Sequence, residues 1–404
     1  MRWLGGVLVL FAGAALYLRV SDVRRPANLL SAPVPAPAPR ALTPANRVTS
    51  IPASLPPGAF GLAALTETAQ TTFIVAGIDG KAEPIAGPLV VDPRSVVFRA
   101  GALAYLVMPG LDPTGNYIEV DELARGEGWQ IRPEAGSAIF GFALDPQGTR
   151  LVYLEADTRV AGARVPWWVI GADLASGAKT VILDGAQLGA VAFLPLDWSP
   201  KMILLRGLTP FSDQHHGLWV ARPDGSDLRQ VATEADYVGG PRLALRPDGD
   251  HLALLASDPS ALPVARQMAG AGEPPANLLR ILDLRSAQFT VMLPPIPERG
   301  LAAAEWTSGG LLALAGEWDA DRNAFVHRSV IELRSEKGTP PEPLYSTDEG
   351  EITQLAPCPD GGWLAAIQVR DRTQIIRVGQ AEPVAEFVGP VLDWLACVSS
   401  EEAR

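Results

Sequence analysis

Positive charge is scarce in this chain. Its 404 residues include 33 Lys and Arg against 45 Asp and Glu, which gives a formal net charge of −12 at pH 7. A nucleic-acid binder needs a basic face that neutralises phosphates and releases their counterions. The composition therefore argues against nucleic acid as the partner.

Long helical periodicity is also missing. No stretch of the body repeats apolar residues at helical spacing for more than about a dozen residues, the length at which a helix becomes the better interpretation. Glycine and proline are abundant instead, at 39 and 37 residues, and both favour turns. We therefore expect a body built from strands and turns.

Several catalytic motifs are absent as well. The sequence contains no Gly-x-Ser-x-Gly motif, which carries the nucleophile of fused serine hydrolases. It also lacks a phosphate-binding loop and a dinucleotide-binding fingerprint. These absences exclude three common enzyme classes, and no cofactor is expected.

Two β-hairpins follow one another in residues 217–257. Each is centred on the same tetrapeptide, Arg222-Pro223-Asp224-Gly225 and then Arg246-Pro247-Asp248-Gly249. Proline presets φ at the first central turn position, aspartate accepts hydrogen bonds from the turn backbone, and glycine closes the turn. Apolar residues alternate around both turns, as in half-buried strands: Leu218, Val220, Leu228, Val231, Leu243, Leu245, Leu252 and Leu254.

Weaker copies of this hairpin recur along most of the chain and predict units of four strands, named a to d in chain order. The a–b turns are expected at residues 145–148, 198–200, 246–249, 306–309 and 358–361, and the c–d turns near residues 79–80, 125–126, 176–177, 223–225, 285–286, 337–338 and 379. Successive c–d turns are mostly about 42 to 52 residues apart, which is the spacing of β-propeller blades. Seven such turns predict seven blades. Six blades are the alternative if residues 89–135 do not form a complete one.

The two ends of the body complement each other. Residues 58–87 supply strands b, c and d without a strand a, whereas residues 391–396 supply a strand a with nothing after it. Leu392-Asp393-Trp394 also repeats Leu196-Asp197-Trp198, which directly precedes an a–b turn. The ends are therefore expected to complete one blade together, which closes the ring and removes exposed sheet edges.

The repeat signature is Trp or Asp, then Ser-Pro or Pro-Asp-Gly, then a short apolar strand. It resembles the TolB-like propeller repeat, which is related to WD-repeat propellers, over residues 58–398. The resemblance implies the all-β propeller fold but no particular activity, because such propellers serve as scaffolds, binding modules and enzyme domains. No residues match the α/β domain that precedes the propeller in TolB itself.

An uncharged segment, residues 3–18, lies between Arg2 and Arg19. It has two interpretations: a retained single-pass anchor whose flanking arginines reach the interface, or a signal peptide cleaved near Ala12-Gly13-Ala14. We expect the body on the extracytoplasmic side, at the cell membrane or secreted. Arginines at positions 19, 24 and 25 run against the usual positive-inside bias.

The remaining boundaries follow from composition. Residues 1–20 are assigned to the anchor or signal peptide, and residues 21–57, rich in proline and alanine, to a disordered linker extended at about 3 Å per residue. The propeller is assigned to residues 58–398. Residues 399–404 form the C-terminal tail.

Function is expected on the face that carries the b–c loops. Short Pro/Gly turns occupy the opposite face, whereas the b–c connections are long: residues 108–116, 155–166, 206–216, 257–277 and 316–327. Long, varied loops on one face of a rigid scaffold mark a binding surface. The candidate binding-face residues are Arg159, Asp213, His215, His216, Tyr237, Trp318, Asp319 and Asp321.

Two of these loops resemble metal-binding segments. Asp213-Gln214-His215-His216 contains imidazole and carboxylate ligands, but one loop rarely surrounds a metal alone. The segment from Trp318 to Asn323 lacks the glycine and distal glutamate of a calcium loop. We therefore expect exposed polar loops and predict no metal site.

Small residues are expected where the strands a enter the central funnel. They are Ser137-Ala138, Gly189-Ala190, Gly239-Gly240, Gly300-Leu301 and Gly389-Pro390. Such residues provide neither a metal shell nor a general base. Glu134, Asp236 and Glu351 lie near the mouth without forming a ring of ligands.

The tryptophans below are expected to pack within the propeller framework rather than in a functional site. Trp198, Trp306 and Trp394 share one repeat position, and Trp167-Trp168 begins a strand c with one indole inside a blade and the other outward.

The only cysteines, Cys358 and Cys397, occupy equivalent positions at the ends of strands a in the last two blades. A disulfide there would staple the ring closure of an exported protein. The competing expectation is that neighbouring blades hold the two Cα atoms beyond the roughly 7 Å that a disulfide spans.

These features favour a membrane-tethered, non-catalytic propeller that binds an unidentified protein or cell-envelope ligand through its long-loop face. The alternative is a metal-dependent hydrolase or lactonase with a site in the funnel.

Overall fold

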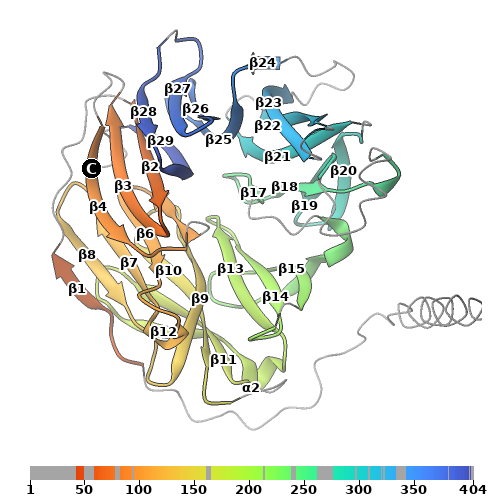
Figure 1. The fold of residues 1–404 in the computed structure, drawn as a ribbon. Helices are drawn as coiled ribbons and strands as arrows, with labels where there is room; N and C mark the ends of the chain where they lie inside the picture. Colours follow the sequence, from red (N-terminus) through yellow and green to blue (C-terminus); the bar gives the residue numbers. More distant parts are fainter. Residues whose placement is uncertain are drawn as a thin grey trace, which may run out of the picture.

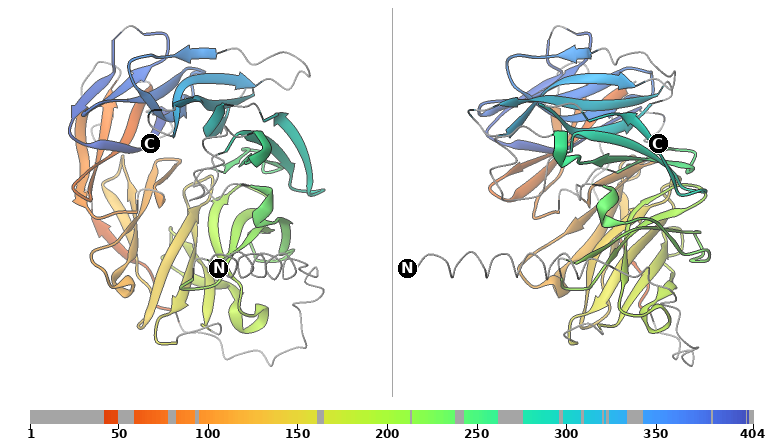
Figure 2. Two further views of the ribbon diagram at one scale, coloured as in Figure 1. Left: turned by 45° about the vertical axis from the view of Figure 1, so that its right-hand side comes forward. Right: turned by 90° about the vertical axis from the view of Figure 1, so that its right-hand side faces the viewer.

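Seven β-sheets surround a common axis in the computed structural model (Figures 1 and 2). The structure describes residues 42–49, 59–77, 82–92, 95–160, 165–212, 214–237, 243–261, 276–295, 298–307, 310–319, 321, 324–333, 343–380, 382–399 and 401. Each sheet is one blade of a β-propeller, and its strands pair antiparallel. The predicted all-β fold is confirmed.

Six blades take their strands a to d from one continuous stretch of chain each. Blade 1 contains β5 (Val97–Arg99), β6 (Ala102–Val107), β7 (Tyr117–Glu122) and β8 (Glu127–Ile131). Blade 2 contains β9 (Ser137–Leu144), β10 (Arg150–Asp157), β11 (Trp167–Asp173) and β12 (Lys179–Asp184). Blade 3 contains β13 (Ala192–Trp198), β14 (Ile203–Leu208), β15 (His215–Ala221) and β16 (Arg229–Ala232). Residues 89–135 thus include a complete blade, which excludes the six-bladed alternative.

The second half of the ring follows the same order. Blade 4 contains β17 (Ala244–Leu245), β18 (His251–Ala256), β19 (Leu278–Asp283) and β20 (Gln288–Leu293). Blade 5 contains β21 (Arg299–Trp306), β22 (Leu311–Asp319), β23 (Ala324–Leu333) and β24 (Pro343–Ser346). Blade 6 contains β25 (Glu351–Pro357), β26 (Trp363–Val369), β27 (Arg372–Arg377) and β28 (Ala385–Val388).

Blade 7 joins the two ends of the body, as the sequence predicts. Its strands are β29 (Val391–Ser399), β2 (Ala59–Glu67), β3 (Gln70–Gly77) and β4 (Ala82–Leu89), in that order across the sheet. Leu62 pairs with Ala396, and Leu65 pairs with Leu392. In Figure 1 the C-terminal β29, in blue, lies beside the N-terminal β2, in orange. The ring is therefore closed by backbone pairing.

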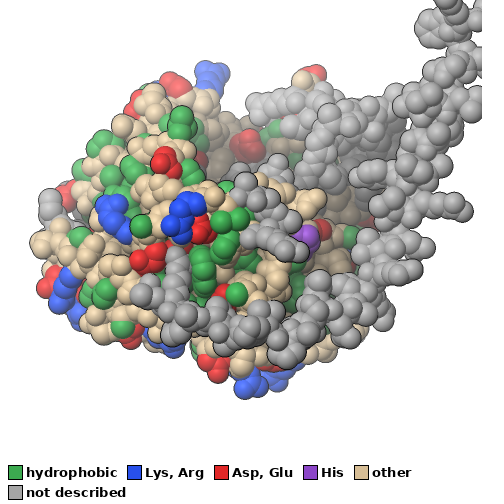
Figure 3. All heavy atoms as spheres, turned by 90° about the horizontal axis from the view of Figure 1, so that it is seen from below, with side chains coloured by type: hydrophobic (Ala, Val, Ile, Leu, Met, Phe, Trp, Pro, Cys, Tyr) green, Lys and Arg blue, Asp and Glu red, His purple; other side chains and the backbone are tan. Residues whose placement is uncertain are grey.

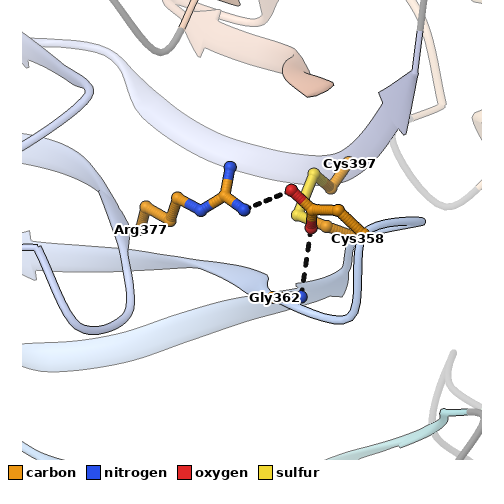
Figure 4. The surroundings of a disulfide bond; sticks show 5 residues. Cys358, Gly362, Arg377 and Cys397 are labelled. Atoms are coloured by element: carbon orange, nitrogen blue, oxygen red, sulfur yellow. Dashed lines mark hydrogen bonds and ion pairs between the residues drawn. A yellow bond between two sulfur atoms is a disulfide. The ribbon is translucent and has the colours of Figure 1, made fainter. Parts of the chain in front are cut away.

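A disulfide reinforces this closure (Figure 4). Cys358 follows β25 of blade 6, Cys397 lies in β29 of blade 7, and their Cα atoms are 4.8 Å apart. The expectation that neighbouring blades hold these positions more than 7 Å apart is wrong, because both cysteines belong to the apolar cluster that joins blades 6 and 7. Beside the disulfide, Arg377 pairs with Asp360, which also accepts a hydrogen bond from Gly362 N at 3.1 Å.

The two Arg-Pro-Asp-Gly segments form the predicted turns. Gly225 N donates to Arg222 O at 2.8 Å, and Gly249 N donates to Arg246 O at 2.8 Å. Both glycines have positive φ, at 84° and 75°, a conformation that only glycine adopts without strain. A Cβ at Gly225 would also lie 2.5 Å from the carbonyl oxygen of Ile182 in blade 2. Turn geometry and the contact with blade 2 therefore both require glycine at position 225.

The hydrophobic core lies between the blades. One apolar cluster fills each of the seven junctions of the described ring. Trp198 is 4% exposed between blades 2 and 3, Trp306 packs between blades 4 and 5, and Trp394 packs between blades 7 and 1. Their predicted framework role is confirmed. Truncating a buried leucine in such a junction to alanine costs about 2–5 kcal/mol.

Trp167 and Trp168 pack on opposite faces of blade 2. Trp167 is fully buried towards blade 3 and donates its indole N–H to Gly189 O at 2.9 Å. Trp168 is partly buried against the cluster between blades 1 and 2. Consecutive residues of a strand point to opposite faces of the sheet. One indole therefore packs on each side of blade 2.

Part of the expected linker is a strand. β1 (Asn46–Thr49) pairs antiparallel with β8 and gives blade 1 a fifth strand. Ala45 N donates to Gly177 O at 2.9 Å, and the Arg47 guanidinium lies 5.8 Å from the Trp129 ring. The prediction of a disordered linker is therefore wrong for residues 46–49, because contacts with blades 1 and 2 order them.

The predicted anchor at residues 3–18 lies outside the described residues. No helix in the described ranges is long and apolar enough to cross a membrane.

Candidate functional site: the loop face

The propeller has two different faces. We call the face of the b–c and d–a connections the loop face, and that of the a–b and c–d turns the turn face. Asp213 lies outside the described residues. The other seven predicted binding residues lie at loop-face connections or at the strand ends beside them, in blades 2, 3 and 5 and in the connection from blade 3 to blade 4. On the side shown in Figure 3, Lys and Arg side chains are interspersed with Asp, Glu and hydrophobic side chains.

Exposed apolar side chains concentrate on the loop face. Among the described residues, eight large apolar side chains are exposed, and six of them lie at b–c or d–a connections or at the strand ends beside them: Val90, Leu111, Val160, Phe211, Val388 and Val391. The other two, Val291 and Leu344, lie on the outermost strands of blades 4 and 5. Single exposed apolar residues occur on any surface, but here most of them lie on one face.

The b–c connection of blade 1 presents Leu111 on a rigid turn. It contains the 3₁₀ helix η2 (Pro113–Gly115), with proline at its first position. Asp112 caps this helix and accepts hydrogen bonds from Thr114 N at 2.9 Å and Thr114 Oγ1 at 2.8 Å, which lower the pKa of Asp112. The leucine that precedes the cap is fully exposed. The cap therefore fixes an apolar side chain in solvent.

The connection of blade 2 holds an arginine in a fixed orientation. Asp157 accepts from Arg159 N at 2.9 Å, Nε at 2.9 Å and Nη2 at 2.7 Å. These hydrogen bonds raise the pKa of Arg159. Arg159 lies across Gly136, where an added Cβ would approach its Cδ to 2.7 Å. An exposed, oriented guanidinium next to Val160 suits a protein interface.

The connection of blade 3 rests on blade 2. Phe211 packs edge to face on Phe140 of β9, with ring centroids 5.1 Å apart. Phe211 is 49% exposed and has a φ of 57°, which is uncommon for a bulky residue. Ser212 N donates to Thr209 O at 3.1 Å, which closes the loop. The sequence did not single out this phenylalanine, because its left-handed conformation has no residue-level signal.

A polar cluster lies next to this loop. Glu234 Oε1 accepts from Tyr237 OH at 2.8 Å and from Gly217 N at 2.9 Å, and Glu234 Oε2 lies 3.3 Å from Arg206 Nη2. Desolvation raises the pKa of Glu234, but these hydrogen bonds and the charge of Arg206 outweigh it, so its net pKa is lowered. Burial and Glu234 raise the pKa of Tyr237. Tyr237, a predicted candidate, is therefore a buried member of an ion-pair network.

Two members of this cluster, Arg206 and Glu234, were not predicted from the sequence. They lie 28 residues apart in the chain and meet only in the folded blade. The local sequence pattern around either residue gives no sign of this contact.

The described part of the predicted histidine segment belongs to blade 3. His216 shares a hydrogen bond with Thr209 Oγ1 at 2.9 Å, and His215 begins β15. Asp213 lies outside the described residues. The described ranges contain no group of three or more His, Cys, Asp or Glu residues placed to hold a metal ion.

Residues 316–327 are mostly strand rather than loop. Trp318 pairs with Phe325, their rings pack edge to face at 5.2 Å, and Asp319 pairs with Ala324. The prediction of a twelve-residue loop is wrong, since this aromatic pair extends the hairpin. Asp321 N donates to Asp319 Oδ1 at 3.0 Å at the hairpin tip. These three candidates lie on blade 5, separate from the group on blades 2 and 3.

The acidic residues near the funnel mouth have structural partners. Glu134 accepts hydrogen bonds from Thr43 N at 2.7 Å and Oγ1 at 2.8 Å, and lies 3.8 Å from Lys179 Nζ. Asp236 forms a capping box with Thr233, and Glu351 begins β25. Glu134 and Asp236 therefore both make contacts that stabilise the fold around them.

The sequence matches no family model and resembles no curated protein. Its fold is similar to that of oligogalacturonate lyase from Vibrio parahaemolyticus, at 11% identity and a TM-score of 0.52 over 82% of this chain and 96% of that one. It is also similar to a protein from Bacteroides fragilis assigned as a 6-phosphogluconolactonase, at 12% identity and a TM-score of 0.50 over 86% and 100%. TolB from Acinetobacter baumannii matches at 13% identity and a TM-score of 0.39 over 70% and 64%.

The chain is a seven-bladed β-propeller, and its predicted fold-level resemblance to other propellers is confirmed. At identities of 11% and 12% the likeness to the first two structures concerns the fold alone. Those two propellers are named for different activities, so the fold does not decide the function.

Proposed function

We propose that this propeller is a non-catalytic binding platform that holds a protein partner on its loop face, outside the cytoplasm. The observation that carries the proposal is the concentration of exposed apolar side chains on that face. Aromatic and arginine side chains are enriched at protein interfaces, and Phe211 and Arg159 are presented there in fixed geometry. An envelope polymer is the competing ligand.

Location is the second part of the proposal. The uncharged segment at residues 3–18 would hold the body at the membrane, and the proline-rich residues that follow would space it from the surface. The disulfide between Cys358 and Cys397 supports an oxidising compartment. Cleavage of the segment would give a secreted body instead.

The binding test compares two sets of substitutions. Leu111→Ser, Val160→Ser and Phe211→Ser together remove apolar area from the loop face of blades 1 to 3. Val291→Ser and Leu344→Ser remove exposed apolar side chains from the outer strands and serve as the matched control. In-cell crosslinking with quantitative mass spectrometry should lose specific protein partners only with the first set.

If both sets and the unchanged protein recover the same partners, the platform proposal is wrong. If the loop-face set loses binding to purified envelope polysaccharide and not to protein, the ligand is the polymer. Location is tested separately by fusing alkaline phosphatase or a fluorescent protein to the C terminus. Phosphatase activity with no fluorescence is expected for an extracytoplasmic body, and the mass of the protein reports cleavage.

A metal-dependent hydrolase or lactonase is the second candidate. The cluster of Arg206, Glu234 and Tyr237 favours it, because it places a carboxylate, a phenol and a guanidinium together on the loop face. Metal analysis of protein purified without chelators tests it, together with lactone hydrolysis assays. Less than stoichiometric metal and no turnover would remove this candidate.

A further inference from the structure

We propose that the turn face carries a separate site for a phosphomonoester, in a basic cleft between blades 3 and 4. The cleft has a volume of about 400 Å³ and is lined by Lys201, Met202, Val220, Ala221, Arg222, Asp227, Arg229 and Arg285. Four of these eight residues are cationic, in a chain whose net charge is −12. The site lies opposite the loop face and does not depend on the function proposed for that face.

The cleft is assembled from turns of two blades. Lys201 belongs to the a–b turn of blade 3, Arg222 to its c–d turn, and Arg285 to the c–d turn of blade 4. Arg222 is the first residue of the first Arg-Pro-Asp-Gly segment, and Asp250 directly follows the second. The first of the two identical turns therefore supplies a positive charge to the cleft, and the second is followed by a negative one.

Asp250 organises one side of the cleft. Its Oδ2 accepts from Lys201 Nζ at 2.7 Å and from Arg285 Nη2 at 2.8 Å, and its Oδ1 accepts from Arg285 Nε at 3.1 Å. One carboxylate thus holds two cations and leaves one positive charge in excess. Their positions are fixed before a ligand arrives, which reduces the entropy lost on binding.

Two further arginines form the other side. Arg229 Nη2 donates to the carbonyl oxygen of Leu284 at 2.5 Å, and Arg229 Nε lies 4.0 Å from Asp227. Arg222 is exposed, and its charge helps to lower the pKa of the neighbouring Asp224. Its guanidinium lies at the edge of the cleft, where an incoming oxyanion can reach it.

The donors of the cleft select the ligand. Its four cations outnumber the carboxylates of Asp224, Asp227 and Asp250 that interact with them, so the cleft keeps a positive excess. Guanidinium groups donate pairs of hydrogen bonds that match phosphate oxygens. A phosphomonoester offers three such oxygens to these donors, whereas a carboxylate offers two. The same chemistry occurs in a soluble sugar or glycerol phosphate and in the headgroup of phosphatidic acid.

The test is isothermal titration of the purified full chain with glycerol 3-phosphate at low salt. Arg222→Gln should weaken binding about tenfold or more, since it removes charge-assisted hydrogen bonds. Arg222→Lys should restore part of the affinity. Arg372→Gln is the charge-matched control, because Arg372 pairs with Glu386 in blade 6 and lies outside the cleft.

Two comparisons complete the design. Vesicles of phosphatidylcholine with and without phosphatidic acid distinguish the sources. If Arg222→Gln weakens binding to the phosphatidic acid vesicles, the ligand is a lipid headgroup. If Arg222→Gln weakens binding to glycerol 3-phosphate alone, the ligand is soluble. Glucuronate tests whether the cleft prefers a phosphate to a carboxylate. The proposal is overturned if no phosphomonoester binds, if the Arg222 and Arg372 variants weaken binding equally, or if glucuronate binds as tightly.

Discussion

Phe211, at the tip of a blade 3 connection, packs edge to face on Phe140 of the innermost strand of blade 2, with ring centroids 5.1 Å apart. The contact crosses a blade junction on the loop face. It fixes the position of an exposed aromatic ring relative to Arg159 and Val160, which belong to blade 2. Part of the proposed platform is therefore preorganised by the packing of neighbouring blades.

The backbone at Phe211 leads to the first prediction. A left-handed conformation costs a non-glycine residue about 1–2 kcal/mol. Phe211→Gly should therefore be more stable than Phe211→Ala by up to about 1 kcal/mol, although both lose the contact with Phe140. Urea unfolding of the two variants measures the difference. Equal midpoints would show that the φ of 57° is not retained in solution.

The disulfide gives the second prediction. It closes a loop with a sequence separation of 39 residues, for which the chain-entropy model predicts a stabilisation of about 4 kcal/mol. The variant carrying Cys358→Ser and Cys397→Ser should unfold at lower denaturant concentration by a corresponding amount. Dithiothreitol should lower the midpoint of the unchanged protein and leave the variant unaffected. If dithiothreitol lowers the midpoint of the variant as well, reduction of this disulfide is not the cause of the change.

Glu234 gives a prediction about pH. Its folded-state pKa lies below the ordinary 4.5, since hydrogen bonds and Arg206 outweigh desolvation. The carboxylate therefore contributes stability that is fully present above about pH 4.5 and is lost as pH falls through the lower folded pKa. Glu234→Gln should show a smaller loss of stability on acidification. Chemical unfolding at pH 7 and at pH 3 to 4 measures this, and identical pH profiles would contradict it.

The fold could be predicted because its determinants are local and repeated. Each Arg-Pro-Asp-Gly turn is specified by four adjacent residues, and the match of Leu392-Asp393-Trp394 to Leu196-Asp197-Trp198 identified the closing strand. In the structure the motif aspartate has a role of its own: Asp197 accepts from Trp198 N at 2.7 Å and from Arg99 at 3.1 Å.

The details that the sequence did not reveal depend on contacts between distant residues. Arg206 meets Glu234 across 28 residues of chain, and Trp318 extends its hairpin because Phe325 faces it across the sheet. The four residues of β1 are too few for an alternating pattern. Their pairing depends on blade 1, which is about 80 residues away in sequence.

β1 gives the last prediction, because it covers the outer edge of β8. Asn46–Thr49 pair with residues 127–130, and Arg47 contacts both Glu127 and the ring of Trp129. Deleting residues 42–49 should expose this edge, lower the denaturation midpoint and promote concentration-dependent association, since an unpaired strand edge is a template for further pairing. Deleting residues 30–37, an equal length of the preceding proline-rich segment, is the matched control and should do neither. Light scattering coupled to size-exclusion chromatography reports association, and urea unfolding reports stability. If both deletions behave like the unchanged protein, β1 does not protect the sheet edge in solution, and residues 42–49 belong to the linker after all.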